Sequence, residues 1–393
     1  MLKLGGQFPL GSQIMKYRNF GKIDFKSSAL GFGTMRFPVI GENSAKIDES
    51  QTKEMIYYAV DNGINYLDTA YVYHQGQSEV VLGKILKDGH REKVKIATKL
   101  PVWLIAGRND LDIIFEEQLR RLQTDHIDFY LLHSLNEEKW SKVLDLRIIE
   151  WLEKKVSQGK INYLGFSFHD QYPLFEKIID SYNKWTFCQI QYNLLDENEQ
   201  AGVKGLKYAA QKGLAVIIME PLKGGKLAHA PKKVQEIWDQ AKSKKSSVDW
   251  ALSWLWNQPE ISLVLSGMSN LNQVKENIKS ASKSEINSLT NAEVSLIKKV
   301  QKKYQELISI PCTKCGYCLP CPKKVNIPKI FEIYNEIRMY DNLAEGIKKY
   351  SSLNPEEKIE NCVSCKRCES LCPQKIKISE KLKEVKKFLA NDK

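Results

Sequence analysis

The chain has 393 residues, with 59 Lys and Arg against 47 Asp and Glu, which gives a formal net charge of +12 at pH 7. Hydrophobic residues make up 42% of it. That is enough for a packed core, and no apolar run approaches the roughly 18 residues of a membrane span. The basic residues form no stripe with interleaved aromatic side chains, which argues against nucleic-acid binding. The positive charge instead favours a phosphate-bearing cofactor or an acidic protein partner.

The start of the chain and its cysteines bear on where the protein works. Residues 1–14 lack the basic and then apolar order of a signal peptide, and we interpret them as a flexible extension. Of the nine cysteines, eight fall in two tight runs near the C-terminus, and Cys188 stands alone on a predicted strand. Such clustering is typical of metal ligation in a reducing compartment, so we expect a cytoplasmic protein. Cys188 is expected to be a small buried core residue.

Apolar runs alternate with amphipathic helical stretches along most of the chain. A β-hairpin is predicted at Tyr17–Lys26, and strands are predicted at Ala29–Phe32, Tyr66–Asp68, Lys95–Thr98, Asp128–Leu132, Ile161–Phe166, Phe187–Gln191, Ala215–Met219 and Ile261–Leu265. Helices are predicted at Gln51–Asn62, Asp110–Leu122, Trp140–Ser157 and Gln200–Lys212, and Gly63, Gly159 and Gly213 follow helices as left-handed C-caps. Alternating strands and helices predict an α/β fold, a (β/α)8 TIM barrel with its chemistry at the carboxyl ends of the strands.

The stretch Asn65–Glu79, NYLDTAYVYHQGQSE, joins a short strand that ends on Asp68 to a loop that presents Tyr73. A phenol titrates near about pH 10, so a tyrosine that exchanges a proton at neutral pH needs a nearby cation with a fixed counter-charge. Lys99 and His133 end the next two predicted strands. Each of these four residues alone is more simply structural. Their positions at corresponding strand ends predict one shared catalytic site.

Further motifs follow in order: GFGTMRFP at Gly31–Pro38, LDTAYVYH, ATK, LLH, GFSFH at Gly165–His169, QIQYN at Gln189–Asn193 and MEPL at Met219–Leu222. Through them, residues 15–282 resemble the aldo/keto reductases. The resemblance implies reduction of a carbonyl to an alcohol, or the reverse, with Tyr73 as the proton donor. Lys99 would lower the phenol pKa and Asp68 would hold Lys99, while His133 would orient the carbonyl. The other two mouth-loop histidines, for which surface or structural roles are expected, are His74 and His169.

The resemblance also implies a nicotinamide dinucleotide, NADPH or NADH, extended across the barrel mouth without a GxGxxG loop. The expected contacts are Gly33, Thr34, Met35 and Asp68 under the cofactor, Ser167 and Gln189 at the carboxamide, Met219 at the ring, Pro221 and Leu222 at the pyrophosphate, and Gly267, Met268, Ser269, Gln273, Glu276 and Asn277 at the adenosine end. Met219 stands where family members commonly stack a Tyr. Gly267 and Gln273 stand where many members clamp a 2′-phosphate with Lys and Arg, which leaves the choice of nucleotide open. The GGK of residues 224–226 is a further candidate for a phosphate contact.

The two cysteine runs are the most specific metal signal in the chain. They read Cys312-x2-Cys315-x2-Cys318-x2-Cys321-Pro and Cys362-x2-Cys365-x2-Cys368-x3-Cys372-Pro. Three cysteines at this spacing wrap one face of a cubane, and the following Cys-Pro commonly binds the other cluster, which predicts two [4Fe-4S] clusters. Crossed ligation would place Cys372 with the first triplet and Cys321 with the second, although the x2 spacing before Cys321 leaves local ligation open. Two zinc ribbons are the alternative, and the evenly spaced third cysteine argues against them.

These patterns divide the chain into an extension at 1–14, a barrel at 15–308 and an iron–sulfur domain at 309–393. Helices are predicted at Pro328–Tyr340 and Leu343–Tyr350, so the tail is similar to an α-helical two-cluster ferredoxin. The hypothesis is an NAD(P)H-dependent oxidoreductase that acts on a small carbonyl or alcohol. Its electron-transfer module would exchange electrons with a ferredoxin or another redox protein. The alternative is an electron-transfer or redox-sensing protein whose barrel binds a nucleotide and docks partners. Exchange between a two-electron hydride and one-electron clusters normally requires a flavin, of which the sequence has no signature.

Overall fold

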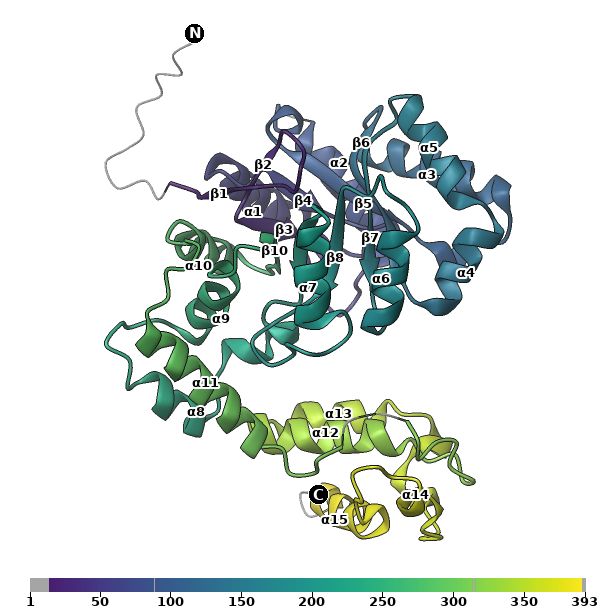
Figure 1. Cartoon of the computed structure of the whole chain (residues 1–393), viewed down its shortest axis with the longest axis vertical. Helices are drawn as coiled ribbons and strands as arrows, with labels where there is room; N and C mark the ends of the chain where they lie inside the picture. The colour runs from purple at the N-terminus through teal and green to yellow at the C-terminus, as the bar shows by residue number, and fades with distance from the viewer. Residues whose placement is uncertain (1–13, 88, 313, 315, 391–393) are drawn as a thin grey trace. The chain divides into compact units, whose positions relative to one another are not determined.

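The computed structural model describes residues 14–87, 89–312, 314 and 316–390. The chain divides into two compact units, the first formed by Met1–Gly224 and Val248–Leu289, the second by Gly225–Ser247 and Thr290–Lys393. The strands belong to the first unit, and the second is helical (Figure 1). The predicted domain boundary after residue 308 lies further along the chain than this division and stays a prediction. No helix of the described residues is long and apolar enough to cross a membrane.

Parallel strands close the first unit into a barrel. Among the described residues there are eight, hydrogen-bonded in the order β10-β3-β4-β5-β6-β7-β8-β9. Their bounds are β3 Leu30–Gly33, β4 Tyr66–Asp68, β5 Lys95–Leu100, β6 Ile127–Leu135, β7 Ile161–Phe168, β8 Phe187–Gln191, β9 Ala215–Met219 and β10 Ile261–Gly267. The (β/α)8 barrel is therefore confirmed, with β10 closing it beside β3.

The predicted hairpin forms at the start of the chain and covers the amino-terminal end of the barrel. Its strands are β1 (Tyr17–Asn19) and β2 (Lys26–Ser28), which pair antiparallel. Phe20 lies between them and is fully buried, with its ring 4.8 Å from that of Phe129 and 5.8 Å from that of Phe187. Because large side chains fill this end, the opposite end of the strands is the one left for a site.

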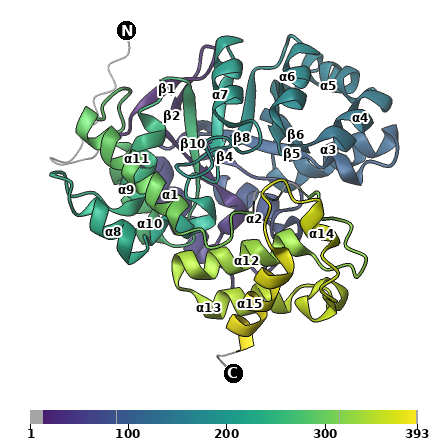
Figure 2. The same cartoon turned by 60° about the horizontal axis from the view of Figure 1, so that its bottom comes forward.

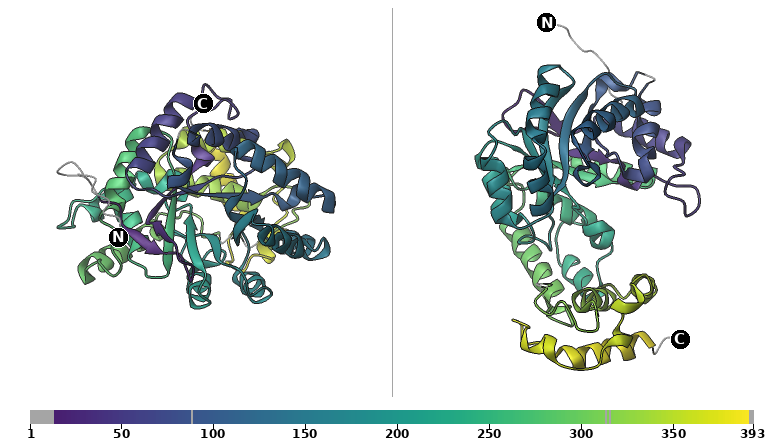
Figure 3. Two further views of the ribbon diagram at one scale, coloured as in Figure 1. Left: turned by 90° about the horizontal axis from the view of Figure 1, so that it is seen from above. Right: turned by 90° about the vertical axis from the view of Figure 1, so that its right-hand side faces the viewer.

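Helices surround the strands of the first unit (Figure 3). They are α1 Glu49–Asp61, α2 Gln77–Leu86, α3 Arg108–Leu122, α4 Glu137–Asp145, α5 Ile148–Ser157, α6 Tyr172–Asp180, α7 Gly202–Gln211, α9 Ser247–Trp256 and α10 Leu271–Ala281. The single helix predicted over Trp140–Ser157 is wrong, because α4 and α5 are separated at Arg147, which has a left-handed φ of 52°. Arg108 donates to the carbonyl oxygens of Leu146 (2.7 Å) and Arg147 (3.3 Å), so the break leaves these backbone groups satisfied.

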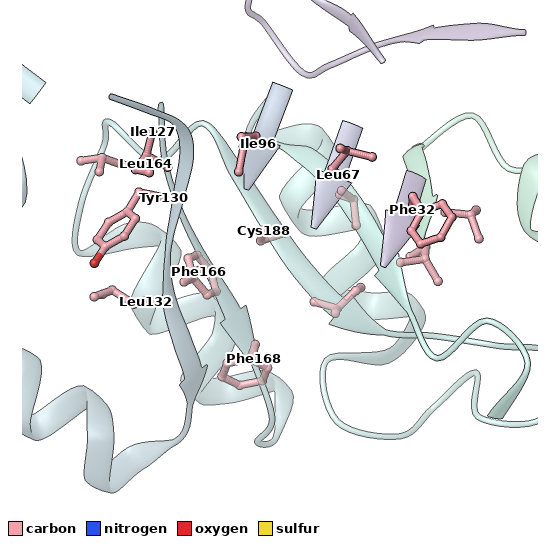
Figure 4. Packing of buried hydrophobic residues seen from close by; sticks show 14 of the residues in the cluster. Phe32, Leu67, Ile96, Ile127, Tyr130, Leu132, Leu164, Phe166, Phe168 and Cys188 are labelled. Atoms are coloured by element: carbon pink, nitrogen blue, oxygen red, sulfur yellow. The ribbon is translucent and has the colours of Figure 1, made fainter. Parts of the chain in front are cut away.

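The hydrophobic core of the first unit lies between the barrel and its helices (Figure 4). Along β7, Leu164, Phe166 and Phe168 belong to this core and are buried, and they alternate with Gly165 and Ser167. Burying such an aromatic or aliphatic side chain contributes about 1.5–3 kcal/mol. Because side chains alternate across a strand, this packing directs Ser167 to the barrel interior.

The second unit is built from helices around its own small core. They are α8 Lys232–Trp238, α11 Asn291–Glu306, α12 Ile327–Tyr340, α13 Leu343–Ser351, α14 Arg367–Ser370 and α15 Ile378–Ala390. The predicted helices at Pro328–Tyr340 and Leu343–Tyr350 are therefore present as α12 and α13. α12 packs against α13 and α15 (Figure 2). Gly346 allows the first contact, since a Cβ at that position would lie 2.1 Å from a side-chain carbon of Ile337.

Candidate functional site

Asp68 and Lys99 form a buried ion pair at the carboxyl ends of the adjacent strands β4 and β5. Lys99 Nζ donates to Asp68 Oδ1 at 2.7 Å and to the carbonyl oxygen of Thr69 at 2.7 Å. Burial works against the charge on Lys99, but Asp68 and Tyr73 together outweigh it and raise the lysine pKa above its usual value. A buried charge is stable only when it is paired and hydrogen-bonded, and both conditions hold here. The structure thus fixes an ammonium group at the barrel mouth.

Tyr73 lies beside this ammonium group, at the start of the 3₁₀ segment η2 (Tyr73–Gly76). Lys99 Nζ is 4.9 Å from the centroid of the half-buried Tyr73 ring. Burial raises the pKa of Tyr73 above its usual value, and the positive charge of Lys99 opposes that rise. We expected Lys99 to lower the phenol pKa. The lysine does act in that direction, but burial outweighs it. The phenol is therefore protonated at neutral pH, as a proton donor must be.

His133, on β6, brings a neutral imidazole to the same place. Its ring meets the Tyr73 ring edge-on, with centroids 6.0 Å apart and an interplanar angle of 79°. Burial, followed by the positive charge of Lys99, holds the pKa of His133 well below its usual value. Its Nδ1 is buried and has no hydrogen-bond partner among the described residues. A neutral imidazole in this position can hydrogen-bond a ligand oxygen.

Of the two other histidines of the mouth loops, His169 lies near enough to His133 to contribute to the lowering of its pKa. His74 lies in η2, where its Nδ1 is 2.7 Å from the carbonyl oxygen of Ser44 and its ring stacks on Phe37. His169 follows β7 and is exposed. The surface or structural roles expected for both histidines stay predictions.

A chain of three hydroxyl groups joins two mouth loops. Ser78, in the first turn of α2, lies 2.7 Å from Thr34 Oγ1 and 2.9 Å from Thr69 Oγ1 through its own Oγ. All three side chains are buried. Ser78 therefore ties the loop after β3 to the loop after β4, whose Thr69 carbonyl also holds Lys99.

A buried polar network on α3 supports the same loops from outside the barrel. Gln118 donates to the Lys99 carbonyl oxygen at 3.1 Å and to Glu79 at 2.8 Å. Arg121 donates to the Tyr71 carbonyl oxygen at 3.0 Å and to Glu79 at 3.3 Å. Sequence analysis missed Gln118 and Arg121, although their spacing places both on one face of α3. They fix the backbone that carries Lys99 and Tyr73.

The cysteine runs of the second unit draw together around a cavity. Cys312, Cys318 and Cys372 line it with apolar side chains that include Ile327 and Phe331. Cys315 lies outside the described residues. Cys372 is the Cys-Pro cysteine of the second run, so its place beside the first run fits crossed ligation of a [4Fe-4S] cluster.

Cys368, of the second run, lies near cysteines of the first run. Burial raises the pKa of Cys368 to about 11, and the nearby Cys318 and Cys321 act in the same direction. Cys362 packs on the apolar core of the unit, and Cys365 is exposed. Within the described residues no three His, Cys, Asp or Glu side chains form a site for a single metal ion. A cubane makes a different demand, because each cysteine binds its own iron.

Comparison with known proteins decides the family. Residues 29–302 match the sequence model of the Aldo/keto reductase family, and residues 311–376 match that of the 4Fe-4S dicluster domain. The chain belongs to the aldo/keto reductase family. It is also an oxidoreductase with a C-terminal 4Fe-4S ferredoxin-type domain, as predicted.

Relatives of known sequence or structure share the barrel. An uncharacterized oxidoreductase of Bacillus subtilis strain 168, YrpG, is 26% identical over 343 residues, which cover 76% of this chain and 97% of that protein. The aldo-keto reductase YhdN of the same organism is 28% identical over 302 residues, covering 66% and 87%. The solved holo form of an aldo-keto reductase from Bacillus halodurans is 27% identical, with a TM-score of 0.60 and coverage of 73% and 96%. A Klebsiella pneumoniae aldo-keto reductase solved with NADPH, at 23% identity and a TM-score of 0.59, shares the fold.

In this aldo/keto reductase, the residues expected at the nicotinamide converge at the mouth. Gly33 lies beside Asp68 on one side and Gly267 on the other in the strand register, and Ser167 lies beside Gln189. Gln189 is buried, and its Oε1 has no partner among the described residues. Ser167 Oγ accepts a hydrogen bond from the Ser134 backbone N–H at 2.7 Å and keeps its own proton to donate. A primary carboxamide, which offers both donor and acceptor, fits these two side chains.

The other expected cofactor contacts differ in how far they reach solvent. Thr34 and Pro221 are buried, Met219 and Leu222 are half-buried, and Met35, Ser269, Gln273 and Glu276 are exposed. Met268 has its side chain fully buried in the hydrophobic core, and the expectation that the segment Gly267-Met268-Ser269 surrounds the adenosine end stays a prediction. Asn277 is also buried, and it donates to Ser266 Oγ at 3.0 Å.

Arg36 is a cation of the mouth that sequence analysis missed. It ends the 3₁₀ segment η1 (Thr34–Arg36), and its stem crosses Gly267, where a Cβ would lie 3.0 Å from Arg36 Cδ. Its guanidinium donates to the Gly224 carbonyl oxygen at 3.4 Å. Lys226, which the GGK motif offered as a phosphate contact, instead forms an ion pair with Glu336. Arg36 thus lies over the strand end where a lysine of the usual clamp is missing.

Proposed function

We propose that this aldo/keto reductase reduces a small carbonyl compound to an alcohol, or catalyses the reverse, with NADPH or NADH. The observation that carries the proposal is the buried Asp68–Lys99 pair beside the protonated phenol of Tyr73 and the neutral ring of His133. These groups come from three neighbouring strand ends, and each has a use in carbonyl reduction. A purely structural cluster has no need of an unpartnered imidazole nitrogen.

The proposed roles follow from the geometry. A bound dihydronicotinamide would supply the hydride to the carbonyl carbon. Tyr73 donates its phenolic proton to the carbonyl oxygen, a general-acid step worth about 10²–10⁴-fold in rate. Lys99 stabilises the resulting phenolate, and Asp68 keeps Lys99 charged and in place. His133 hydrogen-bonds the carbonyl oxygen and orients it toward Tyr73.

The residues of the mouth would hold the nucleotide. Gln189 and Ser167 would bind the carboxamide, and the half-buried thioether of Met219 would cover the ring. The exposed guanidinium of Arg36 would contact a phosphate near the end of β10. One flexible arginine is a weaker clamp than a Lys and Arg pair, so discrimination between NADPH and NADH is expected to be modest.

The second unit would carry two [4Fe-4S] clusters. The proposed ligands of one are Cys312, Cys315, Cys318 and Cys372, and those of the other are Cys362, Cys365, Cys368 and Cys321. Such clusters exchange single electrons, which suits a ferredoxin or another redox protein as partner. The cavity lined by cysteines of both runs supports crossed ligation.

An anaerobic assay tests the proposal. The purified protein is expected to contain about eight irons and to oxidise NADPH or NADH only when an aldehyde or ketone is added. Tyr73→Phe is expected to abolish that carbonyl-dependent oxidation and to leave nucleotide binding and iron content intact. If Tyr73→Phe keeps full activity, the assignment of the four groups is wrong. The barrel is then better explained as a nucleotide-binding and docking platform for the electron-transfer tail.

A further inference from the structure

Lys139 is a second cation close to His133. It lies in the first turn of α4, directly after β6, and is half-buried. Its Nζ is 5.3 Å from the ring centroid of Trp103, and the same ring is 5.0 Å from that of His133. Trp103 belongs to the 3₁₀ segment η4 (Val102–Leu104) after β5, which packs against α4. Trp103 thus lies close both to an ammonium group and to the imidazole of the active site.

Lys139 is not held in an ion pair with an acid among the described residues. Its exposed sequence neighbour Glu138 stabilises the charge from a distance, but burial outweighs that effect and lowers the pKa of Lys139. The carboxylate of the active site, Asp68, is already paired with Lys99. Lys139 therefore adds a second cation near His133, where burial and then the positive charges of Lys99, His169 and Lys139 lower the pKa of the imidazole. A half-buried cation without a counter-charge is costly unless a ligand supplies one.

Two hydrogen bonds hold the Lys139 ammonium group in place and leave one of its N–H donors unused. Nζ donates to the Ser134 carbonyl oxygen at 2.8 Å and to Ser134 Oγ at 3.3 Å. An ammonium group has three N–H donors, so one remains for a ligand. Ser134 follows His133 directly in β6, which couples the position of the cation to that of the imidazole.

We propose that the substrate is a carbonyl compound that also carries a carboxylate, and that Lys139 binds the carboxylate while the carbonyl lies between Tyr73 and His133. Trp103 is close to both polar groups and offers an apolar wall for the carbon skeleton, preferably a flat one. The inference rests on the proposed carbonyl reduction and names its substrate class. It assigns Lys139 to specificity and gives it no part in the chemical step.

A matched pair of aldehydes tests this assignment. 4-Carboxybenzaldehyde carries the required anion, and its methyl ester, methyl 4-formylbenzoate, has the same ring and aldehyde without the charge. Kinetic constants are measured for the wild type, Lys139→Met and Lys139→Arg. Lys142→Met is the control, because this substitution removes one positive charge from the same helix at a side chain that lies near Asp110. Calorimetric binding of 4-(hydroxymethyl)benzoate, the alcohol product, gives a readout that needs no turnover.

The expected result is a change confined to the charged ligand. Lys139→Met should raise KM for 4-carboxybenzaldehyde and the Kd of the alcohol product by about 10- to 100-fold, the usual effect of a charge-assisted hydrogen bond, with kcat almost unchanged. The ester should change by less than about twofold, Lys139→Arg should restore most of the loss, and Lys142→Met should resemble the wild type.

Two other outcomes separate the inference from the proposed function. Equal losses for acid and ester in Lys139→Met, or no preference of the wild type for the acid, would overturn the role of Lys139 while carbonyl reduction stands. If the wild type reduces neither aldehyde but binds the carboxylate alcohol in a Lys139-dependent way, the anion site is supported and carbonyl reduction fails. Absence of binding by the wild type would overturn the anion site.

Discussion

Replacing Tyr73 by Phe removes one hydroxyl group and leaves the ring packed beside Lys99 and His133. The size of the effect depends on whether another group can donate the proton. His133 is a poor substitute, because its pKa lies well below its usual value and the ring carries no extra proton at pH 7. Lys99 is already bonded to Asp68 and to the Thr69 carbonyl. We therefore expect kcat/KM to fall by about 10²–10⁴-fold, which corresponds to about 2.7–5.4 kcal/mol.

The assay is aldehyde-dependent oxidation of NADPH under anaerobic conditions, followed by single-turnover measurements to separate chemistry from product release. Tyr71→Phe is the matched control, since Tyr71 lies in the same loop but donates to Glu117 at 2.6 Å on the outer side. The control should lose about 1 kcal/mol of stability and keep its kcat. Lys99→Met should also lose activity, because the phenolate would lose its stabilising charge and Asp68 its partner.

One pattern of results would refute this reasoning. If Tyr73→Phe and Tyr71→Phe lose the same small fraction of activity, the hydroxyl of Tyr73 has no special role. A fall in nucleotide affinity that accounts for the whole loss would assign Tyr73 to binding. In either case the ion pair of Lys99 would need a structural explanation.

Three further predictions concern the cofactor, the clusters and pH. If Arg36 contacts the 2′-phosphate, Arg36→Gln should weaken NADPH binding about 10-fold and NADH binding much less. Fluorescence titrations measure both affinities, and Arg36→Lys should restore part of the loss. Equal weakening of NADPH and NADH binding would place the contact at the pyrophosphate that they share. Cys372→Ser should damage the cluster of the first cysteine run, and Cys321→Ser that of the second, as read by iron content and electron paramagnetic resonance, whereas local ligation would exchange the two results. The pKa of His133 is lowered in the folded state, so the unfolded chain gains a proton first as pH falls below about 6.5, and stability is lost there. In denaturant titrations at pH 7.5 and 5.5, His133→Gln should lose less stability over this interval than the wild type.

Much of the fold and of the candidate site could be predicted from the sequence because the signals are local. Alternating apolar strands and amphipathic helices indicate parallel βα units, and such units put strand ends on one face. Asp68, Lys99 and His133 could be grouped for that reason, and the structure brings them together around Tyr73. Cysteine spacing is local as well, so the two runs and their cluster type followed without coordinates, and the family comparison supports the dicluster domain.

Contacts between distant elements account for two features that local signals did not predict. The helix predicted over Trp140–Ser157 is interrupted because Arg108, on the preceding helix α3, satisfies the carbonyl groups that the break exposes. Met268 belongs to the segment expected at the adenosine end, and the structure adds that its side chain packs into the core. Neither the break nor the side-chain direction is encoded in residue spacing, since both depend on contacts with other elements.

The sequence by itself determined the barrel, the catalytic candidates and the candidate cluster ligands, because each depends on the period or spacing of neighbouring residues. Only the tertiary structure decided which cations surround the mouth. Arg36 crosses Gly267 because closure of the barrel brings β10 beside β3. Lys139 meets Trp103 because β5 and β6 are adjacent and their following loops pack together. Such contacts join residues far apart in the chain, and only the register of a closed sheet sets their distances.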